Sequence, residues 1–304
     1  MNNPLQNQDK ITFASLENGE ASILFIEATH TVAEAARIHQ TSPVCTAALG
    51  RTLIAAAMVA ARNKDDRASV TVSINGGGPI GKLTAVSDGK TVKGTLGANR
   101  LELPLREDGK LNVGAAVGKD GFLTVVKDLR MKTPYVGQTE LISGELAEDF
   151  AYYFATSEQQ PCLVSLGVLV SGDTVLSAGG VMIAPMPGCS EKTIENLEMR
   201  SMFCADISRE LSYDPAAVLI EKWFEGMQPQ ILDTQPLEYR CNCSRYKMEA
   251  ALLSLGKKEL QGILEDEQEG AELVCHFCHK KYHFNDADIR GLMQREEAED
   301  DTAV

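Results

Sequence analysis

Four cysteines near the carboxyl end of the chain have the types and spacing of metal ligands. They form two short pairs, Cys241-Asn242-Cys243 and Cys275-His276-Phe277-Cys278, separated by residues 244–274. Within each pair both sulfurs can reach one ion, and together the pairs supply the four thiolates of a structural Zn²⁺ site. We therefore predict one Zn²⁺ per chain, bound by Cys241, Cys243, Cys275 and Cys278.

The first pair differs from the common zinc spacing because a single residue separates its cysteines. So short a spacing also lets two thiols join as a disulfide with little movement of the backbone. The same residues can then hold a metal ion or lose it on oxidation, which is the chemistry of a redox switch. His276, His279 and His283 are alternative ligands, although four thiolates already complete the shell.

Side chains around these pairs, and the other cysteines, allow simpler interpretations. Several basic residues lie within five positions of a predicted ligand and either moderate the negative charge of four thiolates or are ordinary surface residues: Arg240, Arg245, Lys247, Lys280 and Lys281. The unpaired cysteines are expected to be packed small side chains: Cys45, Cys162, Cys189 and Cys204.

No other segment carries a credible nucleophile–base constellation. The loop Gly76-Gly77-Gly78-Pro79-Ile80-Gly81-Lys82 fits two nucleotide-binding patterns. Both patterns require a helix after the loop, and the P-loop also requires Ser or Thr where Leu83 stands. The alternating sequence that follows indicates a strand, so the loop is predicted to be a hairpin turn. His30 and His39 lie near the first helical segment without a nucleophile–base motif.

The composition excludes several classes of partner. The chain has 304 residues, 44% of them hydrophobic, and a formal net charge of −14, which disfavours nucleic-acid binding. No apolar run is expected to approach the roughly 20 residues that span a membrane. The start, MNNPLQNQDK, lacks the pattern of a secretory signal. We expect a cytoplasmic protein, whose thiols are kept reduced.

The first domain, residues 1–184, is predicted to be an α+β fold with a mostly antiparallel sheet. β-Prone sequence covers residues 11–27, followed by two helices, the second with Ser42 as N-cap, Pro43 at its first position and an end near Arg62. A further helix is expected from Glu145 to Ser157. Strands are predicted between turn motifs, at residues 69–75, 80–87, 91–97, 122–128, 139–143, 162–170 and 174–184.

Residues 185–236 are predicted to be a helical linker. Apolar residues at near-helical spacing indicate one helix over residues 191–211, and Asp214-Pro215 begins a second that runs to Phe224. Their apolar faces are expected to lie against the first domain while the metal is bound, and to detach when it is lost: Leu197, Phe203, Ile207 and Trp223. The simpler alternative is that both helices belong to the core.

The last third is predicted to be a small four-cysteine zinc redox-switch domain over residues 237–290, with an acidic tail at 291–304. A unit of this size buries little surface, so the metal should supply much of its folding free energy. Its expected helical faces consist of Met248, Ala251, Leu252 and Leu255, ending at Gly256, and then Leu260, Ile263 and Leu264.

With these motifs in view, the chain resembles the redox-regulated thirty-three kilodalton heat-shock chaperonin family. The resemblance rests on Cys-Asn-Cys-Ser-Arg (241–245) and Val-Cys-His-Phe-Cys-His-Lys-Lys-Tyr-His-Phe (274–284). Further matching segments extend it over nearly the whole chain: residues 123–128, 143–153, 166–170 and 179–189. Tyr246-Lys247 departs from the Glu-Arg common in the family and touches no predicted ligand.

The resemblance implies an ATP-independent holdase that prevents unfolding proteins from aggregating under oxidative and heat stress. Such a protein is inactive when reduced and zinc-bound. Oxidation closes disulfides, predicted as Cys241–Cys243 and Cys275–Cys278, and releases zinc. The small domain and linker then unfold and bind client proteins, and the oxidised chain forms a homodimer.

Two other functions use the same cysteines. A zinc-ribbon nucleic-acid or transcription module also has four, but the acidic charge and the Cys-x-Cys spacing weigh against it. A thiol–disulfide oxidoreductase would use Cys275 and Cys278, but its motif normally opens a helix after a strand, and a turn is expected here.

Overall fold

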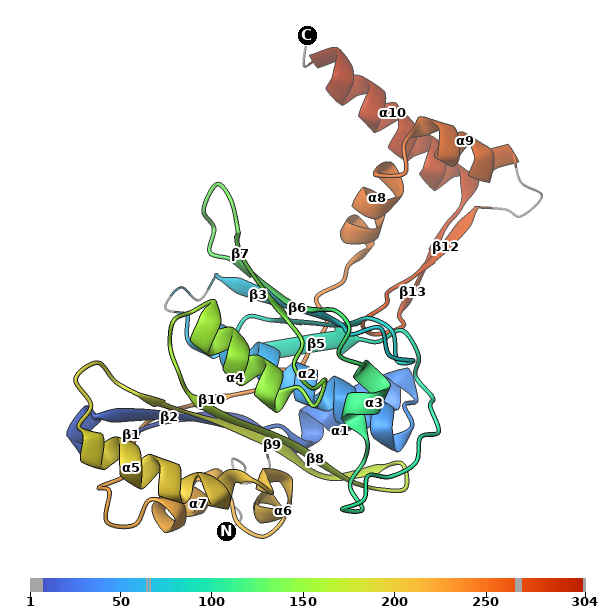
Figure 1. The fold of residues 1–304 in the computed structure, drawn as a ribbon. Helices are drawn as coiled ribbons and strands as arrows, with labels where there is room; N and C mark the ends of the chain where they lie inside the picture. Colours follow the sequence, from blue (N-terminus) through green and yellow to red (C-terminus); the bar gives the residue numbers. More distant parts are fainter. Residues whose placement is uncertain (1–7, 64, 66, 266–269, 303–304) are drawn as a thin grey trace, which may run out of the picture. The chain divides into compact units, whose positions relative to one another are not determined.

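The computed structural model describes residues 8–63, 65, 67–265 and 270–302, and the chain divides into two compact units, Met1–Arg240 and Cys241–Val304 (Figure 1). Each unit is considered by itself. Residues 237–240 belong to the first unit, whereas the sequence pattern had assigned them to the zinc domain.

The first unit contains two sheets and confirms the predicted α+β class with mostly antiparallel pairing (Figure 1). The five-stranded sheet is antiparallel throughout and has the order β10 (Gln230–Pro236), β1 (Lys10–Leu16), β2 (Ala21–Glu27), β9 (Thr174–Pro185), β8 (Leu163–Ser171). The six-stranded sheet has the order β11 (Glu238–Tyr239), β5 (Thr91–Thr95), β4 (Leu83–Ser87), β3 (Ser69–Asn75), β6 (Phe122–Asp128), β7 (Tyr135–Glu140). Only the short β11–β5 pair in this sheet is parallel.

Helix α2 (Pro43–Ala61) packs against strands of both sheets and forms the centre of the main core. Contrary to the expectation from sequence, it is long and apolar enough to cross a membrane, with a mean hydropathy of 1.7. However, 89% of that apolar window is buried inside the fold, as in the core helix of a globular domain. Around it lie η2 (Glu17–Gly19), α1 (Thr29–His39), α3 (Val113–Val117) and α4 (Ala147–Thr156).

Ser42 stands at the N-cap position of α2, as predicted, but its side chain does not cap the helix. Its hydroxyl donates to the Leu101 carbonyl at 3.1 Å and accepts from the Leu101 N–H at 3.0 Å. The residue therefore ties the start of α2 to a distant loop, a contact that a local cap signal does not reveal.

The glycine loop after β3 is a turn between antiparallel strands, as predicted. Gly77 has the expected positive φ of 76°. Gly76 and Gly78 are needed for a different reason: a Cβ on either would lie 2.3–2.4 Å from carbonyl oxygens of Gly118 or Ala116. The loop is thus shaped by close backbone packing against the end of α3, without the helix that a phosphate site needs.

The segment after β9 packs on the other face of the five-stranded sheet (Figure 1), and we call residues 186–229 the connector. The predicted continuous helix over 191–211 is wrong. It is broken into α5 (Glu191–Arg200), η3 (Ser201–Cys204) and α6 (Ile207–Leu211), with non-helical angles at Asp206. This break lets Cys204 and Ile207 both point inward. The second helix, α7 (Ala216–Trp223), begins one residue later than expected, with Pro215 at its N-cap.

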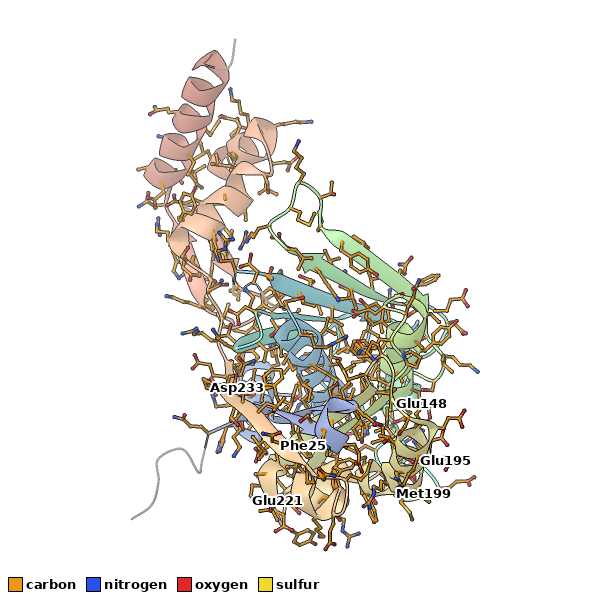
Figure 2. The ribbon with its side chains drawn as sticks, turned by 90° about the vertical axis from the view of Figure 1, so that its left-hand side faces the viewer. Phe25, Glu148, Glu195, Met199, Glu221 and Asp233 are labelled. Carbon is orange, nitrogen blue, oxygen red and sulfur yellow. The ribbon has the colours of Figure 1, made fainter. Side chains whose placement is uncertain are left out.

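Covering the five-stranded sheet on both faces explains the nearly continuous apolar sequence of β2. Alternate residues Leu24 and Ile26 join the cluster around α2, whereas Ile23 and Phe25 join a second cluster with the connector. In that second cluster the rings of Phe25 and Trp223 lie 5.7 Å apart, centre to centre. Phe25 lies between the sheet and the connector in Figure 2.

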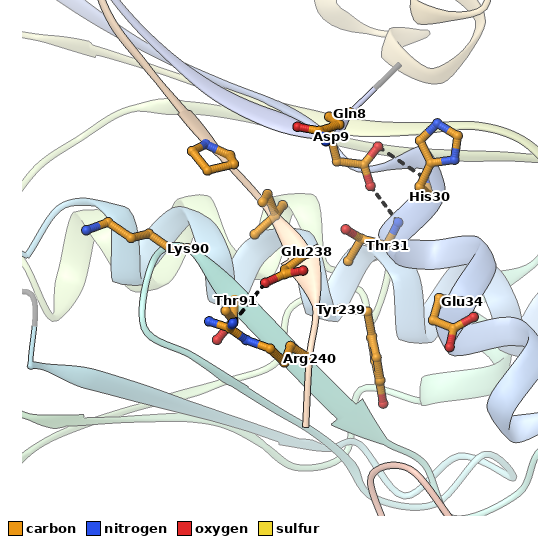
Figure 3. Close-up of a pocket in the computed structure, with 12 residues that line it drawn as sticks. Gln8, Asp9, His30, Thr31, Glu34, Lys90, Thr91, Glu238, Tyr239 and Arg240 are labelled. Atoms are coloured by element: carbon orange, nitrogen blue, oxygen red, sulfur yellow. Dashed lines mark hydrogen bonds and ion pairs between the residues drawn. The ribbon is translucent and has the colours of Figure 1, made fainter. Parts of the chain in front are cut away.

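The connector leads into a strand that the sequence pattern did not predict, β10, and then directly into β11. The chain thereby passes from one sheet to the other within residues 230–240. Leu237 N–H donates to the Asp9 carbonyl at 2.9 Å, and Arg240 N–H donates to the Val92 carbonyl at 3.0 Å. Beside this crossing lies a cavity of about 550 Å³ (Figure 3), where the buried Asp9 carboxylate accepts backbone N–H groups at the start of α1.

The second unit contains α8 (Arg245–Leu253), α9 (Lys257–Glu265), β12 (Ala271–Val274), β13 (Lys281–Phe284) and α10 (Asp286–Thr302). Its core consists of Leu252, Leu260, Tyr282, Phe284, Ile289 and Leu292. Met248, Ile263 and Leu264 pack partly against it, but Ala251 and Leu255 are exposed, contrary to the predicted helix face. The predicted start of an acidic tail at residue 291 falls inside α10, and the neighbouring Leu292 is buried.

Candidate metal centre

Both cysteine pairs lie in irregular segments that are fixed by neighbouring elements. Cys241 and Cys243 precede α8, whose N-cap Ser244 accepts the Lys247 N–H at 3.3 Å. Cys275 and Cys278 lie in the turn between β12 and β13. There Cys275 N–H donates to the Lys280 carbonyl at 3.0 Å and His279 N–H donates to the Cys275 carbonyl at 2.8 Å, with His279 at φ 56°. The turn therefore presents both sulfurs at one end of the hairpin.

The four sulfurs lie within 4.8 Å of one another and could together hold a metal ion. Cys241 Sγ and Cys275 Sγ are 3.7 Å apart, and Cys243 Sγ and Cys278 Sγ are 3.4 Å apart. Tetrahedral Zn²⁺ with bonds of about 2.3 Å requires sulfur–sulfur distances of about 3.8 Å, so the arrangement is close to what this ion needs. Among the described residues, none of the predicted alternative histidines joins this group.

Electrostatics differ among the four thiols. Burial and the neighbouring thiols raise the pKa of Cys278 to about 12, and burial also raises the pKa of Cys241. At Cys243, burial opposes ionisation, but hydrogen bonds from Tyr282 and the other cysteines outweigh it and lower the pKa to about 7. Tyr282 Oη donates to Cys243 Sγ at 3.1 Å. Sequence reasoning missed Tyr282, whose only signal is its place four residues after Cys278.

The basic residues near the cysteines are largely engaged with other groups. Arg245 pairs with Asp288 at 2.8 Å and stacks over Phe284, and Lys281 pairs with Glu272 at 2.9 Å. Lys247 Nζ donates to the Asn242 carbonyl at 3.0 Å, between the first two cysteines, and Lys280 lies over the Tyr282 ring. Lys247 therefore holds the backbone between the first two cysteines, and Lys280 packs on the ring of the tyrosine that donates to Cys243.

The other cysteines lie apart from this group, in the first unit. Cys45 and Cys204 are buried, and Cys162 and Cys189 are partly buried. Burial raises the pKa of both Cys162 and Cys204 to about 12, which keeps these thiols protonated. Cys45, Cys162 and Cys204 pack in or against the apolar clusters, as expected from sequence, whereas Cys189 belongs to neither cluster.

Of the four predicted linker-switch residues, three pack toward the five-stranded sheet and one is exposed. Ile207 and Trp223 are buried against the five-stranded sheet, and Leu197 packs partly on the same cluster. Phe203 is 45% exposed, so the expectation that it faces the sheet is wrong. Cys204 occupies the inward position because the chain tightens into η3 at this point.

Known proteins match this chain over nearly its whole length. The family model described as Hsp33 protein matches residues 9–285. The 33 kDa chaperonin of Ruminiclostridium cellulolyticum is 43% identical over 88% of this chain and 91% of its own length. The 33 kDa chaperonin of Clostridium perfringens is 46% identical over 95% of this chain and 92% of its own length.

A solved structure shows the same fold. The crystal structure of the 33 kDa chaperonin from Thermotoga maritima has a TM-score of 0.88 and 34% sequence identity, and the match covers 96% of this chain and 100% of that one. These three relatives are all named 33 kDa chaperonins, which supports a chaperone function. From its family-model match, its relatives and its fold, the chain belongs to the Hsp33 family.

Proposed function

We propose that this chain is a redox-regulated, ATP-independent holdase, a binding protein and not an enzyme, in which Cys241, Cys243, Cys275 and Cys278 hold one Zn²⁺ in the reduced state. The observation that carries the proposal is the convergence of these four sulfurs within 4.8 Å. When bound, the ion would supply the cross-links that hold the α8 end and the hairpin turn together. Tyr282 would stabilise the Cys243 thiolate through the hydrogen bond described above, and Lys247 would hold the backbone between Cys241 and Cys243 through its bond to the Asn242 carbonyl.

Oxidation would remove these ligands in pairs. In each pair the two thiolates give two electrons to a peroxide and a disulfide bond forms, while the peroxide takes up two protons from the solvent and becomes two molecules of water. We propose the bridges Cys241–Cys243 and Cys275–Cys278, because the shortest loops close most readily. A chain with both bridges retains no thiolate for the ion, so its zinc is released.

Loss of the metal would then unfold the second unit. Its buried core is small, and a structural zinc site contributes on the order of 10 kcal/mol to such folds. We propose that the connector loosens as well, and that its inner face, with Ile207 and Trp223, becomes available to unfolding client proteins. The oxidised form is proposed to be a homodimer that acts in the cytoplasm, without nucleic-acid or membrane partners.

The test is light scattering of a heat-unfolding protein, with a chromogenic zinc probe in the same samples. Reduced, metal-loaded chain should leave aggregation unchanged, whereas peroxide with mild heat should release one zinc per chain and suppress aggregation. A zinc-ribbon module would keep its metal, and an oxidoreductase would turn over thiols without preventing aggregation. Either result would contradict the proposal.

A further inference from the structure

The outer side of the connector carries large apolar side chains that its break leaves exposed. Met199 is 65% exposed, Met202 is 71% exposed and Phe203 is 45% exposed, although their neighbour Cys204 is buried. We call these three residues the Met–Phe surface. Figure 2 shows Met199 and Glu195 pointing away from the fold on α5. Because thioether side chains are flexible and polarisable, such surfaces adapt to varied apolar partners.

A small cavity opens within this surface and is already formed in the folded chain. Its volume is about 320 Å³, and it is lined by Met202, Phe203, Ala205 and the buried Trp223 together with the charged Asp206, Glu210 and Lys222. Arg200 fixes the helices around it by donating to the carbonyls of Trp223 at 2.7 Å and Glu225 at 2.8 Å. The cavity is therefore a preformed recess whose apolar wall is formed by Met202, Phe203 and Trp223.

The surroundings are acidic. Residues 190–228 contain eight acidic and four basic side chains. In the part of the chain that the structure describes, the exposed Glu195, Glu198 and Glu221 have no ion-pair partner. Of the basic residues, Lys222 lies between Glu210 and Asp214, and Arg200 is committed to carbonyls; Lys192 and Arg209 remain exposed. The apolar surface thus belongs to a segment with four more acidic than basic side chains, and the unpaired Glu195 and Glu198 share helix α5 with Met199.

We propose that the Met–Phe surface binds cationic amphipathic helical segments of partner proteins while the four cysteines are still reduced. An apolar helix face would lie on Met199, Met202 and Phe203 and insert one side chain over Trp223, as helices bind in other apolar grooves. Lys or Arg flanking that face would meet the unpaired glutamates. A second copy would oppose the same acidic surface to itself, and an anionic bilayer would be repelled.

This inference goes beyond the proposed function because it requires neither oxidation nor loss of metal. It concerns the outer face of the connector, whereas the proposed switch exposes the inner face. An experiment can therefore contradict this inference without contradicting the proposed function, and the reverse.

The test uses reduced, zinc-loaded chain and a synthetic amphipathic helix built of Lys and Leu, without Trp. Its counterpart carries Glu in place of each Lys. The chain contains one tryptophan, Trp223, so its fluorescence reports binding at the cavity, with titration calorimetry for affinity. The Lys peptide should bind at least about tenfold more tightly than the Glu peptide, and added salt should weaken it.

Paired substitutions test whether the peptide binds at the Met–Phe surface. Met199→Lys with Met202→Lys should weaken binding about tenfold or more, and Glu195→Gln with Glu198→Gln should weaken it several-fold. The matched control is Met131→Lys with Val136→Lys, which adds the same charge at residues 71% and 58% exposed around β7 and should bind like the parent. Circular dichroism with and without peptide checks that the fold is retained.

Equal affinity for both peptides, or an equal loss in the control, would overturn the inference. So would self-association abolished by the Met199/Met202 variant, or preferential binding to phosphatidylglycerol vesicles. Peptide binding only after oxidation would overturn this inference and leave the proposed function standing. Peptide binding to reduced chain, with zinc retained under peroxide, would support the inference and overturn the proposed switch.

Discussion

At the scale of residues, the candidate metal centre consists of four cysteine sulfurs and the Tyr282 hydroxyl that donates to one of them. Two tight pairs in a chain with no other close pair predict that four sulfurs meet, and they lie within 4.8 Å. Tyr282 was not predictable, because its bond to Cys243 depends on the hairpin register that pairs Leu273 with Tyr282. The ligand set and the identity of the metal remain predictions.

Replacing one predicted ligand should release the metal. Cys275→Ser is expected to lower zinc retention to a small fraction of one ion per chain, since three thiolates bind far more weakly than four. Zinc content after gel filtration measures this, with Cys189→Ser, outside the cluster, as the matched control. The assignment would be wrong if Cys275→Ser kept its zinc while His279→Ala lost it.

The disulfide pattern is a second prediction at this scale. The short sulfur contacts in the folded chain run between the pairs, Cys241 to Cys275 and Cys243 to Cys278, so proximity alone does not select the local bridges. We still expect Cys241–Cys243 and Cys275–Cys278, since these loops remain short once the unit unfolds. Peptide mapping by mass spectrometry after peroxide and mild heat tests this. A dominant bridge between the pairs, or one to Cys162 or Cys204, would refute it.

At the scale of elements, periodic sequence patterns predicted most strands and helices. They failed where contacts with distant parts of the chain determine the local structure. Strands β3 and β6 lie at their predicted residues, because alternation marks a strand with one buried face. The prediction for the connector was wrong because it assumed one continuous helix, with one helical phase, through residues 191–211. The η3 turn changes that phase, so Ile207 faces inward and Phe203 does not. Strand β10 was not predicted because it lies at the edge of its sheet with nearly all its side chains exposed, so its sequence does not alternate between apolar and polar residues.

Docking of the connector can be tested with two charge substitutions close in sequence. Ile207→Asp places a carboxylate among buried apolar residues, which should lower the free energy of unfolding by about 3–5 kcal/mol or detach the connector. Phe203→Asp, at an exposed position, should change it by less than about 1 kcal/mol. Denaturant unfolding measures both.

The same pair of variants addresses client binding. If the inner face of the connector binds clients, reduced Ile207→Asp should suppress aggregation without oxidant, and reduced Phe203→Asp should not. Equal behaviour of the two variants would show that connector docking does not control the client site.

At the scale of the whole molecule, the two units have unequal means of staying folded. The first unit has two extensive apolar clusters, and the second has one small cluster of six buried residues. Length and cysteine spacing predicted this inequality, although the boundary between units was misplaced. Residues 237–240 pair with β5, and α10 continues past residue 290, contacts that composition does not report.

Removing the metal should therefore unfold the second unit. A chelator with reductant is expected to abolish amide protection in residues 241–265 and 270–292, because protons and apolar contacts cannot replace the ion's cross-links. Strands β3, β4 and β5 should keep theirs. Hydrogen exchange read by mass spectrometry makes the comparison within one sample, and retained protection in α8 and α9 would show that the second unit folds without metal.

Loss of the metal on oxidation should also loosen the connector in the first unit. On full disulfide formation, amides in residues 190–224 should lose protection by about tenfold or more, whereas residues 69–95 should be unchanged. Unchanged protection in 190–224, together with full suppression of aggregation, would mean that the connector is only core and that clients bind elsewhere.

The strands at the two ends of the connector give its release a definite physical character. Residues 186–229 leave the sheet at the end of β9 and return to it at β10, two strands of the same antiparallel sheet. If both strands hold, a detached connector is a closed polymer loop tethered at each end to its own docking face. The cost of closing such a loop changes slowly with its length, so the freed helices stay at a high local concentration above that face. A bound client then competes with an intramolecular reaction, and its departure would be followed by recapture of the helices without any search.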